Sequence, residues 1–153
     1  MKFYTVFLCL LCLTVTFSCS MRNKQSSASG QGIEGKITLR EGNFMPGPGS
    51  KQPEAKGVKR KLFIYAVATA AQATGQAPLF TAVQTRLVAT TESDAAGVYR
   101  CKLPAGKYSV FTAEENQQLF SSLSNEKGEL SPVEVQPGKF SVLNIVVDYK
   151  AVY

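Results

Sequence analysis

The side chains that could carry out chemistry in this chain are few. Glu114 and Glu115 are its only adjacent carboxylates, and paired carboxylates can serve as general acid and base. They lie in a polar stretch, so we expect a solvated turn instead. The chain contains no histidine, which excludes Ser-His-Asp and Cys-His catalysis and the common zinc sites. We therefore expect no enzyme activity, no metal site and no cofactor.

The four cysteines do not predict disulfide pairs. Cys9 and Cys12 lie in an uncharged, apolar segment that follows Lys2. This pattern predicts an export signal over residues 1–18, and its apolar part is too short to span a membrane. Cys101 is the only cysteine within the following domain, so it has no partner there. We expect it to be a buried and inert thiol.

Cys19 is the strongest candidate for chemical modification. It ends the apolar segment in the sequence Thr16-Phe17-Ser18-Cys19. A small residue directly before a cysteine at this place resembles a bacterial lipobox, although Thr16 and Phe17 depart from its usual residues. Cleavage before Cys19 would leave acyl chains on its sulfur and nitrogen, and two or more chains anchor a protein stably. An ordinary signal peptide cut near Ser18 or Ser20 is the alternative.

The segment after Cys19 is polar and basic. Residues 19–31 are rich in Ser, Gly and Gln, a composition that predicts a flexible tether. The formal net charge of the chain is +6, and removal of Lys2 with the signal leaves +5. In an exported protein this charge favours phospholipid or lipopolysaccharide head groups over nucleic acid as partners. Simple solubility is the alternative role for the charge.

The remaining chain, residues 32–153, has the pattern of one β-domain. Residues 60–67 are apolar on both faces, as in a central strand. Turn residues at 93–97 and 104–106 separate further strands, and Asp94 is expected to cap its turn instead of binding calcium. About seven short strands without a convincing helix predict an all-β, antiparallel β-sandwich. The expected strands are 33–40, 60–67, 79–91, 98–103, 107–113 and 139–149, and residues 119–123 and 131–136 are short strand candidates.

A long segment rich in Gly and Pro, residues 41–59, is the best candidate for a binding loop. Irregular segments of this length are uncommon in small domains and are often functional or disordered. Phe44 and Met45 would offer apolar contacts to a partner, or would fasten the loop to the domain. The basic residues at its end would contact an acidic surface, or would protect a sheet edge from aggregation. The candidate binding residues are Asn43, Phe44, Met45, Lys59 and Arg60.

Two motifs carry a resemblance to a known family. Residues 91–99 (Thr-Glu-Ser-Asp-Ala-Ala-Gly-Val-Tyr) resemble the T-D-x-x-G-x-F/Y hairpin of the carboxypeptidase regulatory-like domain. Residues 103–110 (Leu-Pro-Ala-Gly-Lys-Tyr-Ser-Val) resemble its L-P-x-G-x-Y-x-V hairpin. Residues 32–37 and 133–138 are similar to its opening and closing segments. The resemblance implies a seven-stranded transthyretin-like (prealbumin-like) sandwich with an accessory or binding role and no catalytic residues.

Residues 42–46 and 147–153 are also similar to a group of Bacteroidetes lipoproteins built on this domain. With Cys19, they predict a membrane-anchored lipoprotein whose domain binds an envelope protein or another envelope component. The alternatives are a subunit assembled by strand exchange, suggested by the long last strand, and a hydrolase with an unrecognised site. Ser20 is compatible with the outer membrane. The lack of acidic residues in 21–24 favours its periplasmic face over the cell surface.

Overall fold

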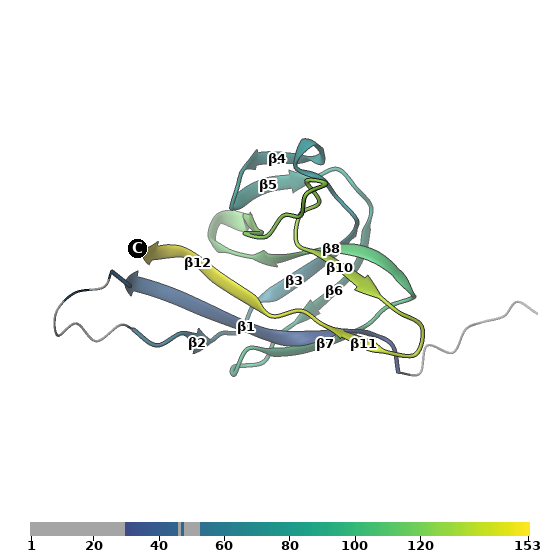
Figure 1. Cartoon of the computed structure of the whole chain (residues 1–153), viewed down its shortest axis with the longest axis horizontal. Coiled ribbons are helices and arrows are strands. Elements are labelled where there is room, and N and C mark those ends of the chain that lie inside the picture. The colour runs from purple at the N-terminus through teal and green to yellow at the C-terminus, as the bar shows by residue number, and fades with distance from the viewer. Residues whose placement is uncertain (1–29, 46, 48–52) are drawn as a thin grey trace, which may run out of the picture.

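The computed structural model describes residues 30–45, 47 and 53–153 (Figure 1). These residues form β-strands and two short 3-10 helices, with no α-helix among them, so the expected all-β class is confirmed. The 3-10 helices are η1 (Ala70–Gln72) and η2 (Glu115–Gln117). The strands are β1 (Gly32–Asn43), β2 (Lys56–Gly57), β3 (Lys61–Ala66), β4 (Ala73–Gln76), β5 (Leu79–Val83), β6 (Leu87–Glu92), β7 (Val98–Lys102), β8 (Gly106–Ala113), β9 (Leu119–Phe120), β10 (Pro132–Val135), β11 (Phe140–Val142) and β12 (Ile145–Val152).

The first sheet has five strands and is built around the long β1. β2 and β7 run antiparallel to β1, whereas β11 and β12 run parallel to it. The expectation of a wholly antiparallel sandwich is therefore wrong for this sheet. The chain returns from the second sheet at the end where β1 begins, as the hydrogen bond from the Gly32 N–H to the Lys139 carbonyl at 3.1 Å shows. A crossover of this kind produces a parallel pair.

The second sheet has seven strands in the order β4-β5-β9-β8-β3-β6, with β10 also paired to β8, and every ladder is antiparallel. β3 has partners on both sides, as its apolar run predicts. Residues 79–91 form two strands instead of the single one expected. The strand is interrupted there because its backbone bonds to two different segments. The Gln84 N–H donates to the Gln72 carbonyl, whereas the Arg86 carbonyl accepts from the Ala66 N–H.

The main hydrophobic core lies between the two sheets and gives them a sandwich-like arrangement. Apolar residues two or four apart along each strand share one face, and that face is buried. Full burial of such a side chain contributes about 1.5–3 kcal/mol. The fully buried core residues include Ile33, Ile37 and Val147 from the first sheet, and Leu62, Ile64 and Val110 from the second.

The two turn motifs join the sheets and do not close hairpins. The turn at 94–97 connects β6 of the second sheet to β7 of the first, and the turn at 104–106 returns the chain to β8 of the second. The predicted pairing of the strands that flank each motif is therefore wrong. Turn residues specify a local reversal, whereas burial of an apolar face decides which strand becomes the partner.

A tyrosine follows each of these turns and is buried at the crossing. The Tyr99 hydroxyl donates to the Leu143 carbonyl at 2.6 Å. The Tyr108 hydroxyl donates to the Pro104 carbonyl at 2.9 Å, an arrangement similar to the tyrosine corner of other two-sheet folds. Both rings belong to the main core and so help to hold each crossing in place.

Three boundaries differ from those expected. Residues 41–59 are not irregular throughout, since β1 continues to Asn43 beside β12 and residues 56–57 form β2. The predicted strand 139–149 is divided into β11 and β12. Gln31, expected in the tether, is buried; it donates to the Leu103 carbonyl and accepts from the Gly138 N–H, both at 3.1 Å. The folded domain therefore includes Gln31.

Candidate functional site

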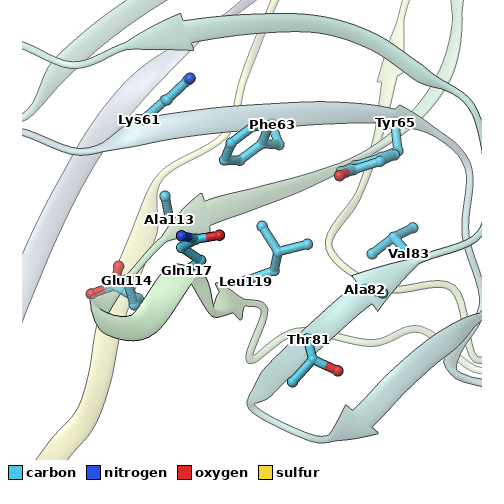
Figure 2. A pocket seen from close by; sticks show the side chains of 10 residues that line it. All are labelled: Lys61, Phe63, Tyr65, Thr81, Ala82, Val83, Ala113, Glu114, Gln117 and Leu119. Atoms are coloured by element: carbon cyan, nitrogen blue, oxygen red, sulfur yellow. The ribbon is translucent and has the colours of Figure 1, made fainter.

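A cleft of about 580 Å³ lies on the outer face of the second sheet (Figure 2). Its floor is formed by Phe63 and Tyr65 of β3, and β5 forms the opposite wall. Lys61, Glu114 and Gln117 lie at one end of the cleft. The lining residues are Lys61, Phe63, Tyr65, Thr81, Ala82, Val83, Ala113, Glu114, Gln117 and Leu119.

The alternation of β3 explains how the cleft forms. Leu62 and Ile64 point into the main core, so Phe63 and Tyr65 must face outward. There they join a second apolar cluster around Phe111, whose ring meets that of Tyr65 edge to face at 5.7 Å. Residues of β5 join the same cluster although β9 and β8 separate β5 from β3 in the sheet. The second sheet therefore curls around this face and leaves a hollow within the curve.

The two polar side chains Lys61 and Gln117 are held at the end of the cleft by local structure. The Lys61 ammonium lies 5.2 Å from the centre of the Phe63 ring, a cation–π distance. Gln117 and its neighbour Asn116 both have left-handed backbones, with φ of 60° and 56°. Asparagine tolerates this conformation, but it costs a residue such as Gln117 roughly 1–2 kcal/mol, and such strain is concentrated at functional sites.

Glu114 is the functional-site residue that the sequence misplaced. We expected it in a solvated turn, but only 1% of its side chain is exposed. The Arg60 Nε–H donates to both carboxylate oxygens, at 3.2 and 3.1 Å. Thr112 and Tyr149 donate from their hydroxyls at 3.0 and 3.3 Å. Because Tyr149 belongs to β12, this carboxylate links the two sheets.

Glu115 behaves as expected for a residue of a solvated turn. Its carboxylate accepts a hydrogen bond from the Lys150 ammonium at 2.6 Å. This hydrogen bond and the charge of Lys150 lower the pKa of Glu115. The same hydrogen bond to Glu115 raises the pKa of Lys150. The two adjacent glutamates therefore face different surroundings and do not act as a pair.

The predicted binding residues Asn43, Phe44 and Met45 lie at the far end of β1. The Asn43 side-chain oxygen accepts a hydrogen bond from the Met45 N–H at 2.8 Å. Phe44 is half-buried against the Tyr153 ring, with 5.9 Å between ring centres, and it lies below the Arg40 guanidinium. Met45 is 48% exposed. The contact between the Phe44 and Tyr153 rings favours the view that Phe44 fastens the segment to the domain.

The other two predicted binding residues lie elsewhere. Lys59 is exposed and pairs with Glu92 at 3.2 Å, while Arg60 is held by Glu114. They follow β2, whose Gly57 lies opposite Thr38 in β1. Asn43 is five residues further along β1, which is roughly 17 Å at the rise of a strand. The structure therefore does not bring the five predicted binding residues into one site.

Asp94 and Cys101 both serve the fold, Asp94 in a turn and Cys101 beside the main core. The Asp94 carboxylate accepts from the N–H groups of Ala96 and Val98, at 2.9 and 2.8 Å, which confirms that it caps its turn. Cys101 is half-buried and packs against the main core. Burial raises the pKa of its thiol, and a thiol that stays protonated is a poor nucleophile.

The lipidation site Cys19 and the predicted signal over residues 1–18 lie outside the described residues. Within the described ranges, no helix is long and apolar enough to cross a membrane. The same part of the chain contains no group of three or more His, Cys, Asp or Glu side chains arranged around a common metal position.

Comparisons of this chain with protein-family models, with curated proteins and with solved structures find no match. The resemblance to the carboxypeptidase regulatory-like domain therefore stays a prediction, based on residues 91–99 and 103–110.

The cleft itself was not predicted, although the sequence contained one signal for it. The run 60–67 is apolar on both faces, and no amphipathic helix was expected that would cover the second face. The outward-facing Phe63 and Tyr65 therefore had to be buried by another element, and the β4–β5 hairpin buries them only in part. Gln117 had no signal, because its place depends on the left-handed turn before β9.

Proposed function

We propose that this chain is an outer-membrane lipoprotein anchored through an acylated Cys19, and that its domain is a non-catalytic binding module. The cleft on the second sheet is the observation that carries the binding role. It combines a floor of Phe63 and Tyr65 with a few polar groups at one end. Sites for small ligands are typically concave and mostly apolar, with a small number of polar groups that orient the ligand.

The state of Glu114 supports binding over hydrolysis. It is the only carboxylate among the residues that line the cleft. Its oxygens already accept hydrogen bonds from Arg60, Thr112 and Tyr149, so it is engaged as a structural anion. A carboxylate held in this way is not free to exchange a proton with a bound molecule, and the chain has no histidine that could take its place.

We also propose that the two sheets form a transthyretin-like sandwich of the carboxypeptidase regulatory-like kind. The support is the pair of motifs at 91–99 and 103–110, each of which makes a turn between the sheets. The buried tyrosine after each turn adds to this support. A solved structure of the domain would test the proposal, and a strand order unlike that of the family would contradict it.

The anchoring part is tested by mass spectrometry of the protein from the membrane fraction. We expect the chain to begin at Cys19 with acyl chains attached, and Cys19→Ala to leave the membrane fraction. Cys101→Ala is the matched control and should stay in that fraction. A wild-type chain that begins at another residue with a free thiol would contradict the anchor and the predicted location together.

The binding part is tested with a neutral photoreactive probe, a long-chain alcohol that carries a diazirine in its chain. We expect it to label peptides of β3 and β5 in the full chain held in phospholipid vesicles. Ala82→Phe fills the cleft from β5 and should abolish this labelling. Ala71→Phe, which adds the same ring to the exposed η1, should not. Labelling that ignores Ala82→Phe would show that the cleft is not the binding site.

A further inference from the structure

We propose that the cleft binds a long-chain amphiphile with an anionic head group, with the head group at Lys61 and the apolar chain along Phe63 and Tyr65. This inference rests on the proposed binding function and names the chemical class of the ligand. Three features carry it: the shape of the apolar floor, the charge left at one end, and the pairing of the surrounding backbone.

The apolar floor is elongated and leads away from Lys61. Lys61, Phe63 and Tyr65 are every second residue of β3. They therefore lie on one face of the strand, in a row of roughly 13 Å. Figure 2 shows Lys61 at one end of this row and Tyr65 at the other, with Leu119 facing the space between them. The volume of about 580 Å³ lies within the range of roughly 300–1,000 Å³ that is typical of small-ligand sites. An extended alkyl chain fits such a space.

The charge at the Lys61 end is positive once its neighbours are paired. Arg60 and Glu114 neutralise each other at 3.1 Å. Glu92, which lies opposite Lys61 in the β3–β6 ladder, pairs instead with Lys59 at 3.2 Å.

No ion pair between described residues includes Lys61. Its ammonium therefore remains to pair with an anion from outside the domain. The Gln117 side chain also lines the cleft, and its amide is a hydrogen-bond donor.

The backbone of the cleft floor excludes an added strand. β3 is hydrogen-bonded along both edges, to β6 and to β8, whereas β5 pairs with β9 only at Leu79 and Phe80. Recognition of an extended peptide by strand addition needs an unpaired edge. A ligand that lies along β3 is therefore recognised through side chains, which here are aromatic, aliphatic and cationic.

The test compares three diazirine probes of the same chain length that end in a carboxylate, a hydroxyl or a primary amine. The full chain in vesicles of neutral phospholipid is titrated with each probe, and labelling of the β3 and β5 peptides gives the half-saturating concentration. We expect the carboxylate probe to saturate at a concentration about fivefold lower than the alcohol, and the amine to be weakest. Lys61→Met keeps an apolar stem of similar length and removes the charge. It should bring the half-saturating concentration of the carboxylate probe to within about twofold of that of the alcohol.

Lys102→Met is the matched control, because it removes one exposed positive charge from β7 of the other sheet. It should leave the head-group preference unchanged. Equal labelling by all three probes, or a preference for the amine, would overturn the anionic ligand while leaving the cleft as a binding site. A carboxylate preference that survives Lys61→Met would overturn the role of Lys61. Failure of all three probes to label the cleft would overturn this inference and the proposed binding function together.

Discussion

Glu114 shows how much one buried carboxylate can connect. It joins Arg60 before β3 to Tyr149 in β12, and so ties the second sheet to the first. We expect Glu114→Ala to lower the free energy of unfolding by about 2 kcal/mol, because it leaves the partly buried Arg60 guanidinium without its anion. Urea denaturation of the chain without residues 1–19 measures this loss. Glu115→Ala is the control; its exposed ion pair should contribute little, and equal losses would contradict the structural role of Glu114.

Tyr99 gives the domain a predicted dependence on alkaline pH. Burial, with a smaller contribution from Cys101, raises the pKa of its hydroxyl well above the ordinary value. Between the unfolded pKa near 10 and the higher folded value, the unfolded chain has lost this proton and the folded chain keeps it. The folded state then binds more protons, so its stability falls as pH rises through this range and is fully present below it.

Tyr99→Phe removes this titrating group and the hydrogen bond to Leu143. We expect the variant to be less stable by about 1 kcal/mol at neutral pH, with a shallower loss of stability above about pH 10. Urea denaturation at a series of pH values measures both effects. Tyr153→Phe, at a tyrosine that is 63% exposed, should change neither. An unchanged alkaline slope in Tyr99→Phe would contradict the role assigned to burial.

At this scale, the sequence predicts residues whose role is local and misses those whose role depends on distant partners. Asp94 was placed correctly because its carboxylate caps N–H groups only two and four residues away. Glu114 was misplaced because Arg60 and Tyr149 are 54 and 35 residues away. Nothing in the polar stretch around Glu114 indicates that Arg60 and Tyr149 will bury its carboxylate.

Among the elements, the turn between β6 and β7 packs directly against β1, where the Ile37 N–H donates to the Gly97 carbonyl at 2.8 Å. Gly97 has φ of +85°, and a Cβ atom there would overlap the Ile37 carbonyl oxygen of β1. Gly128 has a similar φ of +71°, but it has open space around it. Both Ala variants should lose about 1 kcal/mol through backbone strain, and Gly97→Ala should lose about 2 kcal/mol more through the overlap. Equal midpoints in urea denaturation would show that β1 does not constrain this turn.

The strands themselves were easier to predict than their partners. The alternation in β1 and the turn residues around β7 and β8 identified these strands to within a few residues. The pairing of β7 with β8 was wrong because a turn fixes only a local reversal, while β7 buries its face beside β1. The single strand expected over 79–91 failed for a related reason: apolar residues lie on both sides of Gln84 and Arg86, but the backbones of these two residues bond to different segments.

For the whole molecule, this topology predicts two levels of stability. β1 is paired along both edges by four strands, and β3 is paired along both edges by β6 and β8. The β4–β5 hairpin joins the rest of its sheet only through the two-residue β9, and it forms one wall of the cleft. Local opening requires the least free energy where long-range pairing is sparse. The hairpin should therefore open without unfolding the sandwich.

Amide hydrogen exchange resolved by strand measures this difference. We expect amides of β1 and β3 to exchange only through global unfolding, with a urea dependence equal to that of the whole domain. Amides of β4 and β5 should exchange faster and with a weaker urea dependence, because a partial opening exposes less surface. β6 is the control, since it is also an edge strand but pairs with β3 over most of its length. If β4 and β5 were as protected as β3, the wall of the cleft would belong to the rigid core, and a ligand would have to enter without the hairpin moving.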